Sequence, residues 1–355
     1  MSSPASKKLS ESASSDTSFE LEIIALDRLE VTHVRPLAST HCAEARIVVD
    51  KSAVKYLNIR RGVYPIKMLL DPKALLAALP PLPENTWWDY GYVKLYKDTS
   101  EDIPILERVE RQDFPTIYEE ENPDYQWCPK VDYADLVFLG DGTVRGAMFH
   151  GKENVIQVSA PTLGIDVAVA KLSLFPSFPP RPHSEPFVDV AKELRNEIKV
   201  YQKLVGKSLA PRIYALITEN ETRVMGLLME KVEGRSAKFE DLDAIVAKLG
   251  EFHQCGYFHK DAHDENFIIT KKGPVIIDFG WAQPLNSRWG DLDMQDDINQ
   301  VTHVLTDLKN NKQPPKKLRS SRFYLTGPWY RYLKHECFKC KEFLSDWEIP
   351  LGPRD

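Results

Sequence analysis

Residues 257–281 read YFHKDAHDENFIITKKGPVIIDFGW, and this stretch decides how the whole chain is interpreted. It contains two short, mostly apolar runs, FIIT and VII, which are separated by a polar turn that contains glycine. Such a pattern predicts a β-hairpin. Because Asn266 directly precedes the first run and Asp278 directly follows the second, the hairpin is expected to bring these two residues side by side.

The side chains at the ends of this hairpin suit a site for a metal ion and a phosphate. Carboxylate and amide oxygens are hard ligands of the kind that Mg²⁺ prefers when it carries the phosphates of a nucleotide. We therefore expect Asn266 and Asp278 to bind Mg²⁺. We expect Asp261, five positions before Asn266 on a loop, to accept the proton of an attacking hydroxyl. Gly280 is expected to let the backbone turn sharply after the metal ligand.

The composition is that of an ordinary globular protein. The 355 residues include 46 Lys plus Arg and 52 Asp plus Glu, so the net charge of −6 supplies no overall field that attracts nucleic acid or anionic lipid. Five thinly spread cysteines and the lack of an apolar N-terminal segment indicate a reducing compartment. No apolar run has the length of a membrane span. We expect a cytoplasmic protein, with the nucleus as the open alternative, and no nucleic-acid or membrane partner.

The first third of the chain is expected to form a tail and an accessory domain. Residues 1–18 are Ser-rich and lack an apolar period, which predicts a disordered tail. Residues 19–130 are predicted to form an α+β domain, with strands at 45–49 and 90–96 and a helix at 72–79. That helix follows an Asp-Pro pair and stops at a Pro-Pro pair, which are start and stop signals.

An aromatic cluster, WWDYGY at residues 87–92, lies inside this predicted domain. It suits either a ligand platform or the core or docking surface of a small module. The second interpretation is favoured, because aromatic side chains of this kind are generally buried.

Residues 131–232 begin with strand patterns. Apolar runs on both sides of Gly140 and Gly142 predict a hairpin, whose glycine turn is also suited to cradling a phosphate. Lys171 lies inside the apolar strand pattern of residues 167–172, where its neighbours are too apolar for an ordinary solvent-facing position.

A helix is predicted after a proline-rich insertion. Its apolar stripe consists of Ala191, Leu194, Ile198, Tyr201 and Val205. Glu197 borders this stripe, so its carboxylate requires a cationic partner. Glu193, one turn earlier, is the second choice for that role.

Strands at 212–218 and 224–229 and an amphipathic helix that starts near residue 242 lead back to the opening stretch. Another helix is expected to open at Asp297. Strands with one helix, followed mainly by helices, predict an α+β small lobe joined to a helical large lobe.

The sequence His259-Lys260-Asp261 with Asn266, followed by Asp278-Phe279-Gly280, resembles the catalytic loop and metal-binding triplet of the protein-kinase superfamily. The preceding elements occur in the family's order, so the resemblance covers roughly residues 131–310. The whole chain is also similar to a group of fungal kinase-like proteins with an N-terminal extension.

This resemblance implies a two-lobed protein-kinase-like fold, with the small lobe at 131–232 and the large lobe, with a C-terminal extension, at 233–355. It also implies ATP and Mg²⁺ as cofactors. Lys171 matches the lysine that holds the nucleotide phosphates, and Glu197 matches its helix partner. Asp297 matches the aspartate that braces the backbone of the catalytic loop. The implied contacts to the nucleotide are made by Gly140, Gly142, Lys171, Met229 as gatekeeper, and Glu230 and Val232 in the hinge.

Several residues depart from the family's pattern. Arg145 stands where a third glycine is usual, and Lys260 replaces the commoner arginine. His263 stands where Ser/Thr kinases usually have lysine, and it is as suitable for contacting phosphate as for packing. The interval from Asp278 to Asp297 is short and lacks an Ala-Pro-Glu sequence, so the part that docks peptide substrates is reduced.

Two hypotheses follow. The first is an active ATP-dependent phosphotransferase, because every polar residue that the reaction needs is present, and its acceptor is a hydroxyl of a protein Ser/Thr or of a small molecule. The second is a pseudokinase or ATP-binding scaffold whose N-terminal domain binds a protein partner. The irregular glycine loop and the long insertion between Gly142 and Lys171 motivate this alternative.

Overall fold

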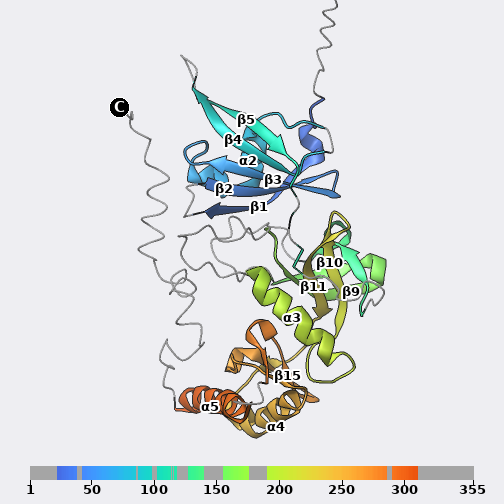
Figure 1. The fold of residues 1–355 in the computed structure, drawn as a ribbon, viewed down its shortest axis with the longest axis vertical. Coiled ribbons are helices and arrows are strands. Elements are labelled where there is room, and N and C mark those ends of the chain that lie inside the picture. Colours follow the sequence, from blue (N-terminus) through green and yellow to red (C-terminus); the bar gives the residue numbers. More distant parts are fainter. Residues whose placement is uncertain are drawn as a thin grey trace, which may run out of the picture.

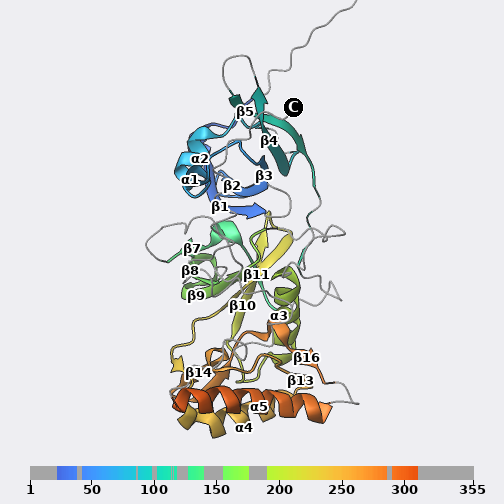
Figure 2. The ribbon, with the colours of Figure 1, turned by 90° about the vertical axis from the view of Figure 1, so that its left-hand side faces the viewer.

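A computed structural model describes residues 22–37, 42–84, 87–97, 102–112, 114, 116–117, 127–139, 155–175, 190–285 and 290–310. The fold is mixed α+β, as predicted from the sequence (Figure 1). Among the described residues there are β-sheets of five, six, three and two strands. The five-stranded sheet lies at one end of the molecule, and the helices α4 and α5 lie at the other (Figure 2).

The five-stranded sheet is formed by the N-terminal region. Its strands, in the order in which they pair, are β1 (Leu29–Leu37), β2 (Cys42–Val49), β3 (Ala53–Arg60), β4 (Tyr90–Lys97) and β5 (Asp102–Glu110). Within the described strands of this sheet, only β3 and β4 pair in parallel, and the connection between them contains the helices α1 (Ile66–Leu69) and α2 (Pro72–Ala78). The Asp71 carboxylate accepts hydrogen bonds from the backbone N–H groups of Lys73 and Ala74, which confirms the predicted helix start.

The core of this region contains part of the aromatic cluster. Trp88 is fully buried and packs among the aliphatic side chains of the sheet, and its indole N–H donates to the carbonyl of Pro83. Trp87, in contrast, is 50% exposed. The cluster is therefore divided between core and surface.

The six-stranded sheet follows in the middle of the molecule. In pairing order its strands are β6 (Lys130–Asp132), β10 (Ile213–Glu219), β11 (Arg223–Glu230), β9 (Ile165–Leu172), β8 (Val155–Ala160) and β7 (Val137–Phe138). Helix α3 (Val190–Leu204) packs beside it with Leu194, Ile198 and Tyr201 buried, as the apolar stripe predicted. Val205 was expected on the same stripe but is 59% exposed, because the helix ends at Leu204.

The third part carries the opening stretch. The predicted hairpin is present as β14 (Phe267–Thr270) and β15 (Gly273–Ile276), joined by β12 (Arg235–Ser236) in a three-stranded sheet. Strands β13 (Tyr257–Phe258) and β16 (Gln283–Pro284) form a second, two-stranded sheet. The remaining short 3-10 helices span Leu26–Arg28, Tyr133–Asp135, Pro161–Leu163, Phe239–Asp241, Asp264–Asn266 and Phe279–Trp281.

Two longer helices, α4 (Leu242–His253) and α5 (Gly290–Lys309), complete this part. Helix α5 begins at Gly290, seven residues before the expected opening at Asp297, since acidic residues fill its first turns and favour its N-terminus. Within residues 233–285 and 290–310, two helices and two small sheets do not amount to the predominantly helical lobe that was expected. No helix in the described ranges is long and apolar enough to cross a membrane.

Several expectations fall outside the described residues. These are the tail at 1–18, the glycine turn with Gly140, Gly142 and Arg145, most of the proline-rich insertion, and the extension after residue 310. The predicted domain boundary at residue 131 stays a prediction.

The N-terminal sheet and the six-stranded sheet share one hydrophobic core. Val48, Val54, Tyr56 and Tyr90 from the first sheet pack in a single buried cluster with Val131, Val158, Ala170, Ile217 and Met225 from the second. A hydrogen-bond pair between Val54 and the side chain of Asn220 adds to this contact, with distances of 2.7 and 3.2 Å. The two sheets therefore form one packed unit.

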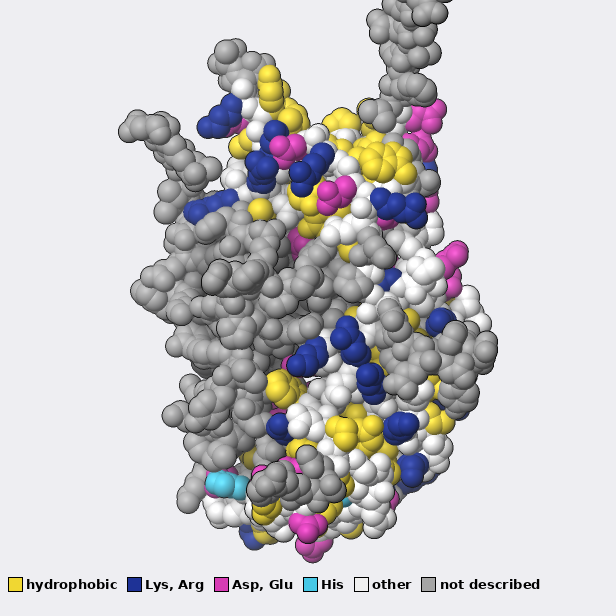
Figure 3. All heavy atoms as spheres, in the orientation of Figure 1, with side chains coloured by type: hydrophobic (Ala, Val, Ile, Leu, Met, Phe, Trp, Pro, Cys, Tyr) yellow, Lys and Arg dark blue, Asp and Glu magenta, His cyan; other side chains and the backbone are white. Residues whose placement is uncertain are grey.

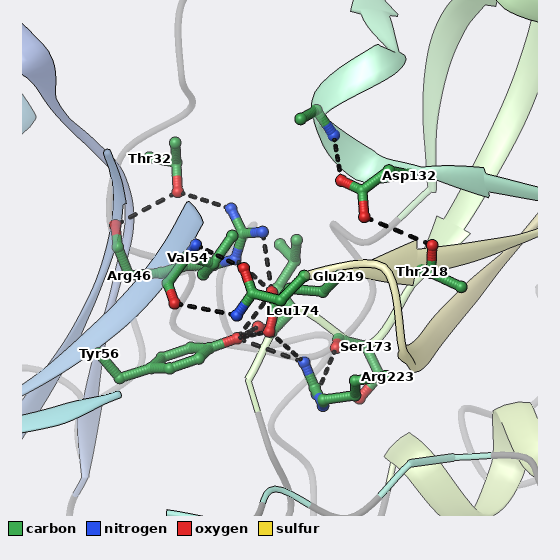
Figure 4. Close-up of polar contacts among 12 residues, drawn as sticks. Thr32, Arg46, Val54, Tyr56, Asp132, Ser173, Leu174, Thr218, Glu219 and Arg223 are labelled. Carbon is green, nitrogen blue, oxygen red and sulfur yellow. Dashed lines mark hydrogen bonds and ion pairs between the residues drawn. The ribbon is translucent and has the colours of Figure 1, made fainter. Parts of the chain in front are cut away.

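Buried charges lie at the centre of this contact (Figure 4). Glu219, at the end of β10, accepts hydrogen bonds from Arg46 at 2.9 and 3.1 Å, from Arg223 at 2.8 Å and from the Tyr56 hydroxyl at 2.9 Å. Burial lowers the pKa of Arg46, but the attraction of Glu219 and its neighbours outweighs it and raises that pKa overall. Arg46 thus stays charged inside the protein.

Candidate active site

Lys171 is the point at which three elements of the site meet. It lies near the end of β9, between β8 and β11, and its side chain is 24% exposed. The ammonium Nζ is 2.5 Å from Glu197 Oε2 on α3 and 3.0 Å from Asp278 Oδ1 after β15. The structure therefore supplies the cationic partner that Glu197 was expected to need.

The electrostatics of this group are those of one ammonium shared between two carboxylates. Burial lowers the pKa of Lys171, but Glu197 and Asp278 outweigh burial and raise that pKa overall. Burial raises the pKa of Glu197 to about 7, although Lys171 draws it down. Lys171 is therefore charged at neutral pH, and its ammonium group is shared between the carboxyl groups of Glu197 and Asp278.

Asp278 has an unusual backbone conformation. Its φ of 63° and ψ of 64° place it in the left-handed region, which is uncommon for a residue other than glycine. The sharp turn thus occurs at Asp278 itself, and Gly280 is needed for another reason than the predicted one. A Cβ on Gly280 would lie 3.2 Å from the Cβ of Glu193, so the missing side chain lets α3 approach the turn closely.

Asp261 and Asn266 lie together on the loop before β14. Both are buried, and the amide nitrogen of Asn266 donates to the Asp261 carbonyl at 2.8 Å and approaches its carboxylate at 3.4 Å. This contact fixes which way the Asn266 amide faces, because its nitrogen end is held by Asp261.

His263 has a structural contact in this loop. Its Nδ1 accepts a hydrogen bond from the Glu265 backbone N–H at 3.2 Å and so caps the short helix Asp264–Asn266. The proton of the neutral ring is consequently on Nε2, which lies 3.6 Å from Asp261 Oδ2. Of the two roles left open by the sequence, these contacts favour packing and orientation.

Asp297 on α5 holds the backbone of this loop by hydrogen bonds. Its carboxylate is 1% exposed and accepts hydrogen bonds from the backbone N–H groups of His259 at 2.6 Å and Lys260 at 2.7 Å, as the kinase resemblance implied. Lys260 has a φ of 62°, so the brace holds a backbone conformation that is otherwise unfavourable. Gln300, one turn later on α5, accepts from the Ala262 N–H at 3.1 Å. Sequence reasoning missed Gln300, although its spacing of one helical turn from Asp297 was a usable signal.

Two hydrogen bonds of the Ile277 backbone join these groups into one site. The Ile277 N–H donates to the Asn266 carbonyl at 3.0 Å, so Asp278, the next residue, lies beside Asn266 as the hairpin predicted. The His259 ring donates from Nε2 to the Ile277 carbonyl at 3.0 Å. The backbone of Ile277, directly after β15, thus holds the loop with Asp261 next to the turn with Asp278.

The residues expected to contact the adenine lie at the end of β11. Met229 is buried, with its sulfur 4.0 Å from the Tyr201 hydroxyl. The Glu230 backbone N–H donates to the Arg212 carbonyl at 2.8 Å, so this amide is already engaged, while Val232 is half-buried in the connector. Farther along, a Cβ on Gly234 would lie 2.5 Å from Ile268 Cγ2, so the connector passes closely against β14.

The donor set fits Mg²⁺. The Asn266 nitrogen faces Asp261, which leaves the amide oxygen as the end that can bind a cation, and the neighbouring Asp278 carboxylate is 26% exposed. Within the described residues there is no cluster of three or more His, Cys, Asp or Glu side chains suited to a metal ion. Two hard oxygen ligands suit Mg²⁺, which keeps several waters and takes further ligands from phosphates.

Comparison with known proteins finds short similarities to kinases. No protein-family model matches the chain. A stretch of 43 residues is 42% identical to a probable serine/threonine-protein kinase, PkwA, of Thermomonospora curvata and covers 12% of this chain and 6% of that protein. A stretch of 74 residues is 30% identical to the serine/threonine-protein kinase ppk35 of Schizosaccharomyces pombe and covers 21% of this chain and 11% of that kinase. The chain therefore has a partial, weak similarity to serine/threonine-protein kinases.

Proposed function

We propose that the protein is an ATP-dependent phosphotransferase of the protein-kinase-like fold. The observation that carries this proposal is the convergence of Lys171 with Glu197 and Asp278, within 2.5 and 3.0 Å, next to a loop that holds Asp261 and Asn266. The sheet of β6 to β11 with α3 is then the small lobe, and residues from 233 onward belong to the large lobe. The partial similarity to serine/threonine-protein kinases supports the same reading.

Each residue has a defined task in this proposal. Lys171 holds the phosphates of ATP, and Glu197 fixes the position of its ammonium group. Asn266 and Asp278 hold Mg²⁺, which when bound neutralises negative charge on the phosphates. Met229, Glu230 and Val232 line the side where adenine is expected to bind.

Asp261 is the proposed base. The acceptor hydroxyl gives its proton to this carboxylate while its oxygen bonds to the γ-phosphorus, and the bond from that phosphorus to the bridging oxygen breaks to release ADP. Asp297 accepts from the backbone N–H groups of His259 and Lys260, and Asn266 donates to the Asp261 carbonyl. These bonds hold the loop that carries Asp261 in one place, which is the preorganisation that such a transfer needs.

The acceptor is proposed to be a hydroxyl of a protein Ser/Thr or of a small molecule. The similarity to serine/threonine-protein kinases favours a protein, whereas the short interval between Asp278 and Asp297 favours a small acceptor. Incubation with γ-labelled ATP and either generic protein substrates or a metabolite extract separates the two, because the label moves to only one of these fractions.

Nucleotide binding is the first test. We expect ATP to raise the melting temperature of the full chain more with Mg²⁺ than with EDTA, and Asp278→Asn to abolish the part that depends on Mg²⁺. A chain that gives no Mg²⁺-dependent shift and no turnover is not a phosphotransferase. A shift without turnover, on protein and metabolite fractions alike, identifies the alternative, an ATP-binding scaffold.

A further inference from the structure

Three consecutive residues of α3 contact three different parts of the protein. Glu197 contacts Lys171 of the six-stranded sheet, Asn196 contacts the turn after Asp278, and Arg195 contacts the segment that leads out of the N-terminal sheet. Successive helical residues point about 100° apart, so three consecutive residues can reach partners in three directions. We propose that Arg195 and Asn196 are positioning residues, through which the N-terminal region sets the Lys171–Glu197–Asp278 group. The inference rests on the proposed function.

Asn196 ties α3 to the turn after Asp278. Its amide nitrogen lies 3.2 Å from the carbonyl oxygen of Phe279, 3.1 Å from that of Gly280 and 2.6 Å from that of Ala282. The close approach of Glu193 to Gly280 and the edge-on contact between Tyr201 and Phe279, with ring centroids 5.1 Å apart, reinforce the same junction. Any shift of α3 therefore moves the turn that carries Asp278.

Arg195 ties α3 to the segment between β5 and β6. Its Nε donates to the Ile117 carbonyl at 2.9 Å. The Ile117 N–H donates to the Val224 carbonyl at 3.0 Å, and the Val224 N–H donates to the Thr116 hydroxyl at 3.1 Å. Ile117 is also 2% exposed and belongs to the buried cluster that includes Leu194 and Ile198 of α3. Thr116 and Ile117 are consequently a fixed contact of α3 and β11.

Two links connect α3 and its neighbouring strands with the N-terminal sheet. The chain reaches Ile117 from β5, and the sheet itself is docked on β10 by Glu219 and its partners. Movement of the N-terminal sheet would strain the Ile117 contact and, through Arg195, the helix that presents Glu197. The N-terminal region then acts as a part of the catalytic apparatus that holds α3 in its productive position.

The surface of α3 offers matched controls. Lys and Arg side chains gather on the face of the molecule over α3 (Figure 3), where Lys192, Arg195, Lys199 and Lys203 are exposed. Lys199→Met removes the same charge from the same helix face as Arg195→Met, without touching the Ile117 carbonyl. Asn299→Asp makes on the surface of α5 the chemical change that Asn196→Asp makes at the junction.

Steady-state kinetics on the full chain form the first arm of the test. We expect Asn196→Asp to lower kcat about tenfold or more and to change the KM for ATP less than about threefold, because Asn196 does not contact the nucleotide but aligns the groups around it. Arg195→Met should also lower kcat, while the kcat of Lys199→Met and of Asn299→Asp should stay near that of the parent chain. If both α3 variants keep the kcat of their controls, the inference is wrong.

Hydrogen exchange forms the second arm, and it does not need turnover. Arg195→Met and Asn196→Asp are expected to speed amide exchange in α3 and in residues 279–285. Exchange rates in β1 to β5 should stay unchanged, which would show that the variants are folded. An unchanged rate at 279–285 in both variants overturns the inference. A parent chain that neither binds ATP with Mg²⁺ nor turns over refutes the proposed function, and the exchange result alone then decides whether α3 couples these segments.

Discussion

Substituting Glu219 by Gln tests how the N-terminal sheet is held on the rest of the protein. The Glu219 side chain is 1% exposed and is the only carboxylate that the described residues place against both Arg46 and Arg223, whose side chains are 0% and 7% exposed. Glu219→Gln keeps the shape and one acceptor oxygen but removes the negative charge. Two buried guanidinium groups then lose the negative charge of Glu219.

The magnitude follows from the burial. Breaking a buried ion pair by removing one partner costs about 3–5 kcal/mol, mainly because the remaining charge is unpaired in a medium of low polarity. A domain has a total stability of about 5–15 kcal/mol, so this loss is a large fraction of it. Since the Tyr56 hydroxyl also donates to Glu219, the loss falls on residues from both sheets at once.

The assay is urea unfolding followed by tryptophan fluorescence, together with amide exchange in β1 to β5. Glu219→Gln is expected to lower the unfolding midpoint and to speed exchange in the N-terminal sheet. Glu107→Gln is the matched control, because Glu107 pairs with Arg60 and Lys94 at the surface, where screening by solvent makes ion pairs weak. A loss of stability in Glu219→Gln no larger than that in Glu107→Gln would refute the reasoning.

Combining the change with Arg46→Met separates the pair from the general cost of mutation. The double variant removes one buried cation along with the anion, so its loss should be smaller than the sum of the two single losses, by roughly 0.5–3 kcal/mol. Additive losses would show that Arg46 and Glu219 do not stabilise each other.

Further predictions concern the site itself. The pKa of Glu197 is raised to about 7, so the folded protein binds more protons than the unfolded chain between pH about 4.5 and 7. In thermal melts the parent protein should therefore lose stability relative to Glu197→Gln as pH rises through this window, by at most about 3 kcal/mol. A stability difference that stays constant with pH would contradict this. Asp297→Ala should lower stability by about 1–3 kcal/mol in urea unfolding and reduce phosphotransfer, since it leaves the N–H groups of His259, which is buried, and Lys260, which is part-buried, without their acceptor. Gly234→Ala should lower the unfolding midpoint, because its Cβ would lie 2.5 Å from Ile268 and 2.7 Å from the Ile269 carbonyl, whereas Gly250→Ala, in a helix with open space around it, should leave the midpoint unchanged or raise it.

Local features of the structure could be predicted from the sequence. The β14–β15 hairpin follows from two apolar runs around a glycine turn, and the start of α2 follows from Asp71 and Pro72. The need of Glu197 for a cation follows from its place beside an apolar helical stripe, and Lys171 meets that need. In each case a pattern within a few residues, or one strict chemical requirement, is sufficient to predict the feature.

The contacts that could not be predicted join residues far apart in the chain. Arg46 lies in the mostly buried strand β2, and its ion-pair partner Glu219 comes 173 positions later in the chain. Asn196 looks like an ordinary polar helix residue, and its three carbonyl partners come from a turn more than eighty positions away. The role of Gly280 was assigned to backbone freedom, because a sequence does not show how closely a distant helix approaches.

The most direct test of the account is γ-phosphate transfer from labelled ATP with Mg²⁺, measured for the parent chain, Lys171→Met and Asp261→Asn. We predict transfer by the parent chain, a loss of at least about a hundredfold in each variant, and retained Mg²⁺-dependent nucleotide binding in Asp261→Asn, because that carboxylate acts on the acceptor. Equal transfer by the parent chain and Asp261→Asn, or no transfer by the parent chain to any protein or metabolite fraction, would contradict the account.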